Sequence, residues 1–183
     1  MTQPAARFAA AVAAMAVLVA ASNILVQHQI NDWLTWGALT YPITFLVTDL
    51  VNRGDGPTTA RRVVLTGFLT AILVNGVIAY QAGSWELARI AAASVTAFLV
   101  AQMMDVQVFD RLRRGAWWRA PLASSLIASG IDTVLFFPLA FYGTGVPWET
   151  LLVGDYAVKA ALAFLMLGPF RLMLPALPAR GAS

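Results

Sequence analysis

The sequence predicts an all-α integral membrane protein, a bundle of six transmembrane helices with both termini in the cytoplasm. Three observations lead to this prediction. Of the 183 residues, 60% are hydrophobic and 11% are charged, whereas soluble domains carry roughly 25% charged residues. Apolar stretches of about 20 residues, long enough to cross a bilayer, recur along the chain. Arginines gather between alternate stretches, as they do in cytoplasmic loops.

We expect the six spans at residues 8–26, 35–51, 63–82, 87–109, 122–142 and 150–174. They take up nearly the whole chain, so residues 1–183 are expected to form a single transmembrane domain. The first stretch also resembles a secretory signal peptide, because a basic residue precedes it and small residues follow its apolar middle. We interpret it as a span, since its apolar run continues to Val26 and removing it would leave five spans.

The basic residues are strongly asymmetric between the two sides of the expected bundle. The opposite side holds Arg89, and Lys159 lies within the sixth span. This asymmetry predicts that both termini are cytoplasmic. It also argues against nucleic-acid binding, because no stacking or binding motif accompanies the arginines. Ten of the twelve basic residues lie on the predicted cytoplasmic side: Arg7, Arg53, Arg61, Arg62, Arg111, Arg113, Arg114, Arg119, Arg171 and Arg180.

The composition excludes most enzyme chemistry. The chain has no cysteine and one histidine, so thiolate chemistry and multi-histidine metal sites are absent. His28 lies in a short outer segment, and no GxSxG motif, P-loop or dinucleotide fingerprint is present. We therefore expect a protein that is not an enzyme and that uses no cofactor or metal.

Asp132 is the most informative polar residue within a span. It lies about eleven residues into the fifth span, close to the midplane at 1.5 Å per residue. An aspartate at this depth costs about 2.5–3.5 kcal/mol on insertion scales. No basic residue of the same span can reach it, and Ser125 and Ser129 share its helical face. This pattern favours a ligand-binding role for Asp132, with Ser129 beside it.

Three further spans carry amides or carboxylates. Asn23 and Asn75 lie in the first and third spans, and Gln102 and Asp105 lie one turn apart in the fourth. These side chains either bind a ligand or only form hydrogen bonds between helices, which contribute about 0.6 kcal/mol each.

Asp155 and Lys159 in the sixth span are spaced i, i+4 and can pair along the helix. They form either an inert ion pair or a proton-linked coupling pair.

The second span combines a proline with a polar face. Pro42 removes a backbone donor, and Asp49 lies beside the polar face. Asp49 and Asp105 both lie near the cytoplasmic ends of their spans, so they either form salt bridges with nearby arginines or face a ligand. The polar face consists of Tyr41, Thr44, Thr48 and Asn52, and the arginines in reach are Arg53, Arg61, Arg62 and those in segment 110–114.

The aromatic residues divide into two groups. Six tryptophans lie at or just outside span ends, as is typical of membrane interfaces. Phe98, Phe136 and Tyr41 lie within spans and could stack on a planar ligand. Together with the net-acidic interior, this pattern favours a carrier of a small polar or cationic solute.

Several segments resemble the queuosine precursor transporter family over almost the full chain and in the same order. They are ASNILVQ, TYPITFLVTDLVNR, ARRVV, AFLVAQMMDVQVFDRLR, WWRAPLASS, IDTVLFFPLAF and DYAVKAALAFLMLGPFRL. The resemblance implies import of the 7-deazaguanines preQ0 and preQ1 for tRNA modification, with a purine-like small molecule and the lipid bilayer as partners.

A guanine-like ligand suggests roles for the polar residues. A carboxylate can accept hydrogen bonds from both adjacent N–H groups of the Watson–Crick edge, and a side-chain amide can donate one to O6. We assign Asp132 or Asp105 to the first role and Asn75, Gln102 or Asn23 to the second. Other predicted substrate-binding residues are Asp49, Ser129, Phe98, Phe136 and Tyr41.

Two alternatives stay open. The chain could be the substrate-binding subunit of an energy-coupling-factor vitamin transporter, or a membrane scaffold that transports nothing. The small-residue stripes of the first span permit a homodimer without requiring one.

Overall fold

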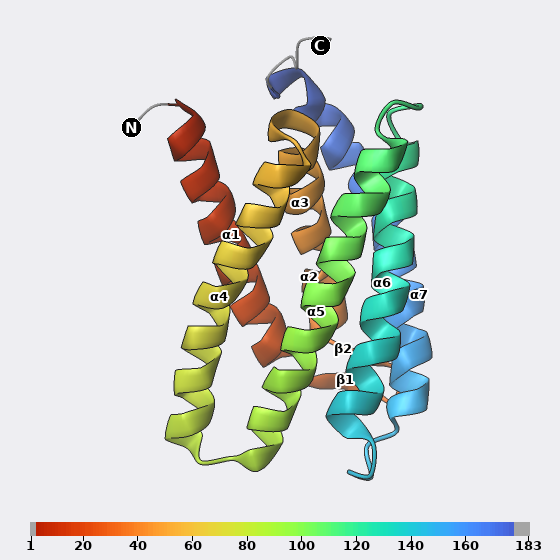
Figure 1. The fold of residues 1–183 in the computed structure, drawn as a ribbon. Coiled ribbons are helices and arrows are strands. Elements are labelled where there is room, and N and C mark those ends of the chain that lie inside the picture. The colour runs from red at the N-terminus through yellow and green to blue at the C-terminus, as the bar shows by residue number, and fades with distance from the viewer. Residues whose placement is uncertain (1–2, 178–183) are drawn as a thin grey trace.

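The computed structural model describes residues 3–177. Its helices pack into one bundle (Figure 1). Within these residues, five helices are long and apolar enough to cross a membrane. Each covers one of the expected spans, with ends that differ by a few residues. They are α1 (Gln3–Leu25), α4 (Pro57–Ala82), α5 (Trp85–Leu112), α6 (Arg119–Phe141) and α7 (Trp148–Met173), and a 3-10 turn over Leu174–Ala176 follows α7.

The expected second span, residues 35–51, is divided next to Pro42, and its helical part continues to Asp55. The structure has a short α2 (Gly37–Thr40) followed by α3 (Pro42–Asp55). Pro42 has no N–H to continue the hydrogen-bond ladder, and it starts α3 instead. Gly56 ends α3 with a φ of +92°, a conformation that favours glycine. Residues 37–55 together extend about 28 Å at 1.5 Å per residue.

A small hairpin replaces the outer segment that was expected to be a simple loop. Strands β1 (Gln29–Asn31) and β2 (Leu34–Thr35) pair antiparallel. The Thr150 hydroxyl at the start of α7 donates to the Asp32 carbonyl over 2.5 Å. The hairpin is therefore tied to α7, at the end of the bundle away from the start of α1 (Figure 1).

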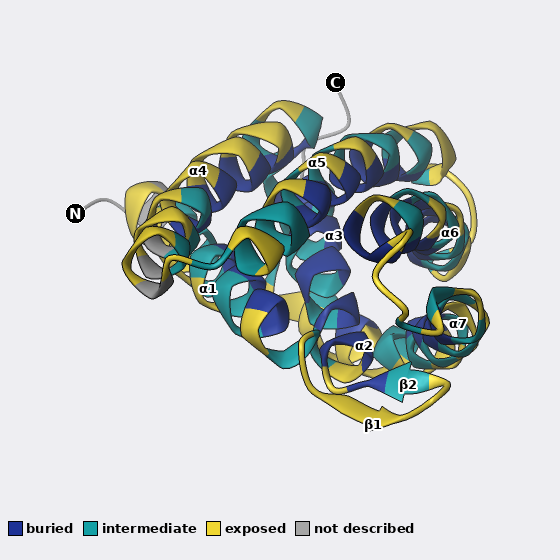
Figure 2. Cartoon of the chain, turned by 90° about the horizontal axis from the view of Figure 1, so that it is seen from below, coloured by how far each residue is buried: buried dark blue, intermediate teal, exposed yellow. Residues whose placement is uncertain are grey.

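Helix α3 lies in the middle of the bundle, in contact with α1, α4, α5, α6 and α7 (Figure 2). Its polar face is fully enclosed, since Thr44, Thr48, Asp49 and Asn52 are all buried. Because no water reaches these side chains, any hydrogen bonds they form must come from neighbouring helices or a bound ligand.

The outward faces of the long helices are apolar. Leu73, Val134 and Leu165 are 71%, 60% and 65% exposed. A bundle with an apolar surface and buried charged groups has the arrangement expected in lipid. Trp33, Trp36, Trp85 and Trp118 are exposed at or near helix ends, as expected for an interfacial position.

The ends that carry most arginines lie together. The start of α1, the α3–α4 turn, the α5–α6 connection and the end of α7 are at the same end of the bundle (Figure 1). Arg180, which is predicted to lie on the cytoplasmic side, is outside the described residues. The α4–α5 turn, the α6–α7 connection and the hairpin lie at the other end.

Candidate functional site

A buried cluster of three charged side chains joins α6 and α7. Lys159 Nζ lies 2.6 Å from Asp155 Oδ2 on its own helix and 2.8 Å from Asp132 Oδ2 on α6. Each of these three residues is 3% exposed. The i, i+4 spacing accounts for the contact with Asp155, whereas the contact with Asp132 depends on how the two helices pack.

Hydroxyl groups complete the cluster. Tyr41 donates its hydroxyl to Asp132 Oδ1 over 2.7 Å, and Thr133 donates to Asp155 Oδ2 over 2.8 Å. Lys159 Nζ also lies 4.7 Å from the centre of the Tyr41 ring, a cation–π contact. Both Asp132 oxygens therefore have a partner. With all three groups ionised, two carboxylates and one ammonium leave a formal charge of −1.

The break in the second span positions Tyr41. This residue lies between α2 and α3, directly before Pro42. At this point near the middle of the bundle, its hydroxyl reaches across to α6. The proline that prevents a continuous helix therefore lies next to the aromatic residue that contacts the ion cluster.

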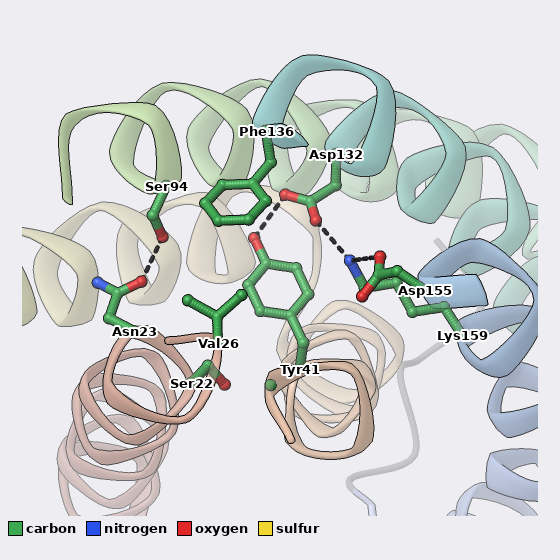
Figure 3. Close-up of a pocket in the computed structure, with 10 residues that line it drawn as sticks. Ser22, Asn23, Val26, Tyr41, Ser94, Asp132, Phe136, Asp155 and Lys159 are labelled. Atoms are coloured by element: carbon green, nitrogen blue, oxygen red, sulfur yellow. Dashed lines mark hydrogen bonds and ion pairs between the residues drawn. The ribbon is translucent and has the colours of Figure 1, made fainter. Parts of the chain in front are cut away.

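A small cavity adjoins the cluster (Figure 3). Side chains from α1, α5, α6, α7 and the α2–α3 segment converge on it, so it lies in the half of the bundle nearer the hairpin. About 30 Å³ of this space is open to a water-sized sphere, so a heterocycle would enter only if the lining side chains moved apart. The lining residues are Ser22, Asn23, Val26, Gly37, Tyr41, Ser94, Asp132, Phe136, Asp155 and Lys159.

The wall opposite the cluster is polar where α1 meets α5. Ser94 Oγ donates to Asn23 Oδ1 (Figure 3), and the hydroxyls of Ser22 and Thr40 lie 3.0 Å apart. Val26 and Phe136 supply apolar surface between this wall and Asp132. The cavity thus combines a charged end, a neutral polar wall and an apolar middle.

Four of the predicted substrate-binding residues line this cavity: Asp132, Asn23, Phe136 and Tyr41. Asp155 and Lys159, which the sequence suggested as a separate coupling pair, line the same cavity. Sequence reasoning missed Ser22, Val26 and Gly37 as lining residues. The position of Ser22 beside Asn23 near the end of the first span was the signal available for it.

Gln102 and Phe98 do not line this cavity. Gln102 is fully buried, donates to Thr44 Oγ1 over 3.0 Å and accepts from Thr48 Oγ1 over 2.7 Å. Phe98 stacks on Phe68 at 5.1 Å between ring centres and packs edge-on against Tyr41. Both side chains therefore join α5 to its neighbours.

Asn75 and Ser129 face other spaces. Asn75 lines a cavity between α1, α4 and α5, which it shares with Asn23. Ser129 and Asp49 line a small space in the half nearer the termini, and Lys159 also lines it. Lys159 therefore lies between two spaces, one on each side of the ion cluster.

The expected salt bridges of Asp49 and Asp105 are absent from the described residues. Arg53 donates instead to the Arg113 carbonyl over 2.7 Å, and Arg61 and Arg62 are exposed. Asp105 is fully buried beside Asp49. The salt-bridge interpretation of these two aspartates is wrong because the arginines nearby in sequence turn toward other partners or outward.

Comparison with known proteins links the chain to one family. Residues 35–173 match a family described as putative vitamin uptake transporter. The chain is 34% identical over 175 residues to a queuosine precursor transporter of Escherichia coli, covering 84% of this chain and 79% of that protein.

Two further relatives carry the same description. A probable queuosine precursor transporter of Haemophilus influenzae is 33% identical over 186 residues, covering 83% of this chain and 79% of the relative. Another, from Bacillus subtilis, is 27% identical over 156 residues, covering 73% and 68%. No solved structure matches.

Proposed function

Because the chain belongs to the queuosine precursor transporter family, we propose that it imports the 7-deazaguanines preQ0 and preQ1 across the inner membrane. The observation that carries the proposal is the cavity beside Asp132. It places two carboxylates and one ammonium inside an apolar bundle, where such groups are costly unless they have a role.

The Asp132–Lys159 pair complements the Watson–Crick edge of a 7-deazaguanine. This edge presents two adjacent N–H donors and the O6 acceptor. Asp132 would accept the two donors, and Lys159 would donate to O6 while it stays paired with Asp155. Tyr41 and Lys159 contact the two Asp132 oxygens, so substrate would replace these contacts.

The remaining walls suit the rest of a flat heterocycle. Phe136 and Val26 offer apolar surface for the ring faces. The Asn23–Ser94 pair and Ser22 provide polar groups at the far end. The formal charge of −1 favours the aminomethyl cation of preQ1 over the neutral nitrile of preQ0.

The proposed orientation gives an uptake direction. The arginine-rich end of the bundle would face the cytoplasm, and residues 1–183 would form one transmembrane domain. The cavity lies in the opposite half, so in this conformation the site would be nearer the outside. Transport would then require a second conformation in which it faces inward.

The test is queuosine recovery in living cells. A host that lacks both precursor synthesis and its own transporter would express this chain and be fed low preQ0 or preQ1. We expect queuosine to reappear in its tRNA. If the protein reaches the membrane and no queuosine forms with either precursor, the proposed substrates are wrong.

A further inference from the structure

A second pair of buried acidic side chains lies outside the cavity that we assign to substrate. Asp49 on α3 and Asp105 on α5 lie side by side and are 2% and 0% exposed. The hydroxyl of Ser124 on α6 donates to Asp49 Oδ1 over 3.4 Å. Two ionised carboxylates this close repel each other strongly when no water surrounds them.

The buried oxygens around this pair lack donors. Within the part of the chain that the structure describes, no hydrogen bond of standard geometry reaches Asn52 Oδ1 or either Asp105 oxygen, and the neighbours of Asp105 are the Ser124 hydroxyl and the Asp49 carboxyl. Asn52 Nδ2 donates to the carbonyl of Val106, next to Asp105, over 3.1 Å. Three buried acceptors therefore lie at one level between α3 and α5, and what they lack is a proton or a cation.

The basic side chains on the surrounding helices do not supply this charge. Lys159 pairs with Asp132 and Asp155, and Arg53 donates to the Arg113 carbonyl. The others are paired elsewhere or exposed. Arg7 pairs with Asp55, Arg113 pairs with Asp110, and Arg89 donates to the Leu139 and Tyr142 carbonyls. Arg171 lies over Trp117, and the exposed ones are Arg61, Arg62, Arg111, Arg114 and Arg119.

We propose that Asp49, Asp105 and Asn52 form a binding site for a small monovalent cation, a proton or a sodium ion, which drives transport. Either cation would offset the carboxylate repulsion and satisfy the unpartnered oxygens. The driving role rests on the proposed transport function, whereas binding of the cation does not.

The position of this site allows it to act on the substrate cavity without being part of it. Ser124, which contacts Asp49, lies eight residues before Asp132 on α6, roughly 12 Å along the helix axis. The small space that Asp49 lines is also lined by Lys159. A cation that binds or leaves at Asp49 would therefore change the electrostatic field at the ammonium that holds Asp132.

The first experiment measures cation binding without substrate. The melting temperature of the purified full chain would be followed in two titrations, one of pH in sodium-free choline buffer and one of sodium against choline at fixed pH. A cation that binds only the folded state raises this temperature. We expect a rise with falling pH for a proton site, or with sodium for a sodium site.

Two variants test whether the shift in melting temperature comes from Asp49 and Asp105. Asp105→Asn and, independently, Asp49→Asn should lose the shift, while Asp110→Asn, which removes a partly exposed carboxylate of the same helix, should keep it. If both variants respond like the wild type in both titrations, the proposal is overturned.

The second experiment needs only the wild type, so it does not depend on the folding of any variant. Proteoliposomes would be given an inward proton gradient, an inward sodium gradient or neither, with labelled preQ1 outside. With a tenfold cation gradient and one cation carried per substrate, we expect one of the two gradients to raise internal preQ1 up to about tenfold above equilibration.

Two contrary outcomes are distinguishable. Equilibration of preQ1 that neither gradient increases would exclude the driving role while the proposed substrate stands. A cation-dependent melting shift that Asp105→Asn removes, in a protein that moves no preQ1, would support the cation site and count against the proposed substrate.

Discussion

Lys159 Nζ lies 2.8 Å from Asp132 Oδ2, and this contact joins α7 to α6 inside the bundle. The lysine also holds Asp155, so one ammonium serves two buried carboxylates. In an apolar interior each carboxylate would be costly alone. The pair is therefore both a structural link between helices and the charged end of the cavity.

We expect Lys159→Met to destabilise the protein. The substitution leaves Asp132 and Asp155 buried without a cation, and breaking a buried pair from one side costs about 3–5 kcal/mol. The measurement is the fraction of folded, monodisperse protein that survives heating. Arg62→Met on the exposed face of α4 is the control and should change stability by less than about 0.5 kcal/mol. Adding Asp132→Asn to Lys159→Met should recover part of the loss, and wild-type stability of Lys159→Met alone would contradict the prediction.

We expect Asp132→Asn to impair precursor uptake. An amide cannot accept both N–H donors of the guanine edge, and a hydrogen bond to a charged group contributes about 1.5–3 kcal/mol. The loss corresponds to roughly 10- to 100-fold in affinity. The loss of uptake is measured as the amount of queuosine in tRNA when preQ1 is limiting. The amount of protein in the membrane is quantified in parallel. Asp110→Asn is the matched control, and full recovery by Asp132→Asn would remove Asp132 from the site.

Gln102 should behave as a structural residue. Its amide joins Thr44 and Thr48 on α3 to α5, so Gln102→Leu would leave two buried hydroxyls short of a partner. We expect a loss of about 1–2 kcal/mol in stability. Thermal stability should fall while queuosine recovery, at matched protein level, stays close to wild type. A large loss of recovery in a variant of normal stability would instead return Gln102 to the substrate site.

The helices could be predicted from sequence because their signals are local. Apolar length and charged ends predicted five of them to within a few residues, and the i, i+4 spacing predicted the contact of Asp155 with Lys159. The contact of Lys159 with Asp132 could not be predicted, since spacing along one helix does not say which helix lies beside it. Pro42 marked the place of a possible break, but the sequence did not decide between a kink and a division, because prolines are also common within continuous transmembrane helices.

The same limit applies to the candidate site residues. For Asp49 and Asp105 the sequence left open either a ligand or salt bridges with arginines close in sequence, but closeness in sequence does not fix the direction of a long side chain. Gln102 and Asp132 are both buried polar residues within spans. Gln102 contacts a neighbouring helix, whereas Asp132 lines a cavity. The packing of whole helices decides between these two outcomes.

Gly154 should not tolerate a side chain, because a Cβ at this position of α7 would collide with the carbonyl oxygen of Trp33 in the hairpin. We expect Gly154→Ala to destabilise the protein by about 1–3 kcal/mol by overpacking. Gly168→Ala is the matched control on the same helix, since nothing lies within 4 Å of its added Cβ. It should be neutral or stabilising by up to about 1 kcal/mol. Melting temperatures of the two variants provide the comparison, and equal effects would mean that the hairpin can move away from α7 at little cost.

The orientation can be tested on α4 alone, because the chain has no cysteine and a single introduced thiol reports one position. Thr58 and Gln81 are exposed near opposite ends of this helix. With the arginine-rich end in the cytoplasm, we expect a membrane-impermeant maleimide to label Gln81→Cys in intact cells. Thr58→Cys should react only after the membrane is opened. The reverse pattern would invert the proposed topology and place the substrate cavity in the cytoplasmic half, and labelling of both residues in intact cells would mean that α4 does not cross the membrane.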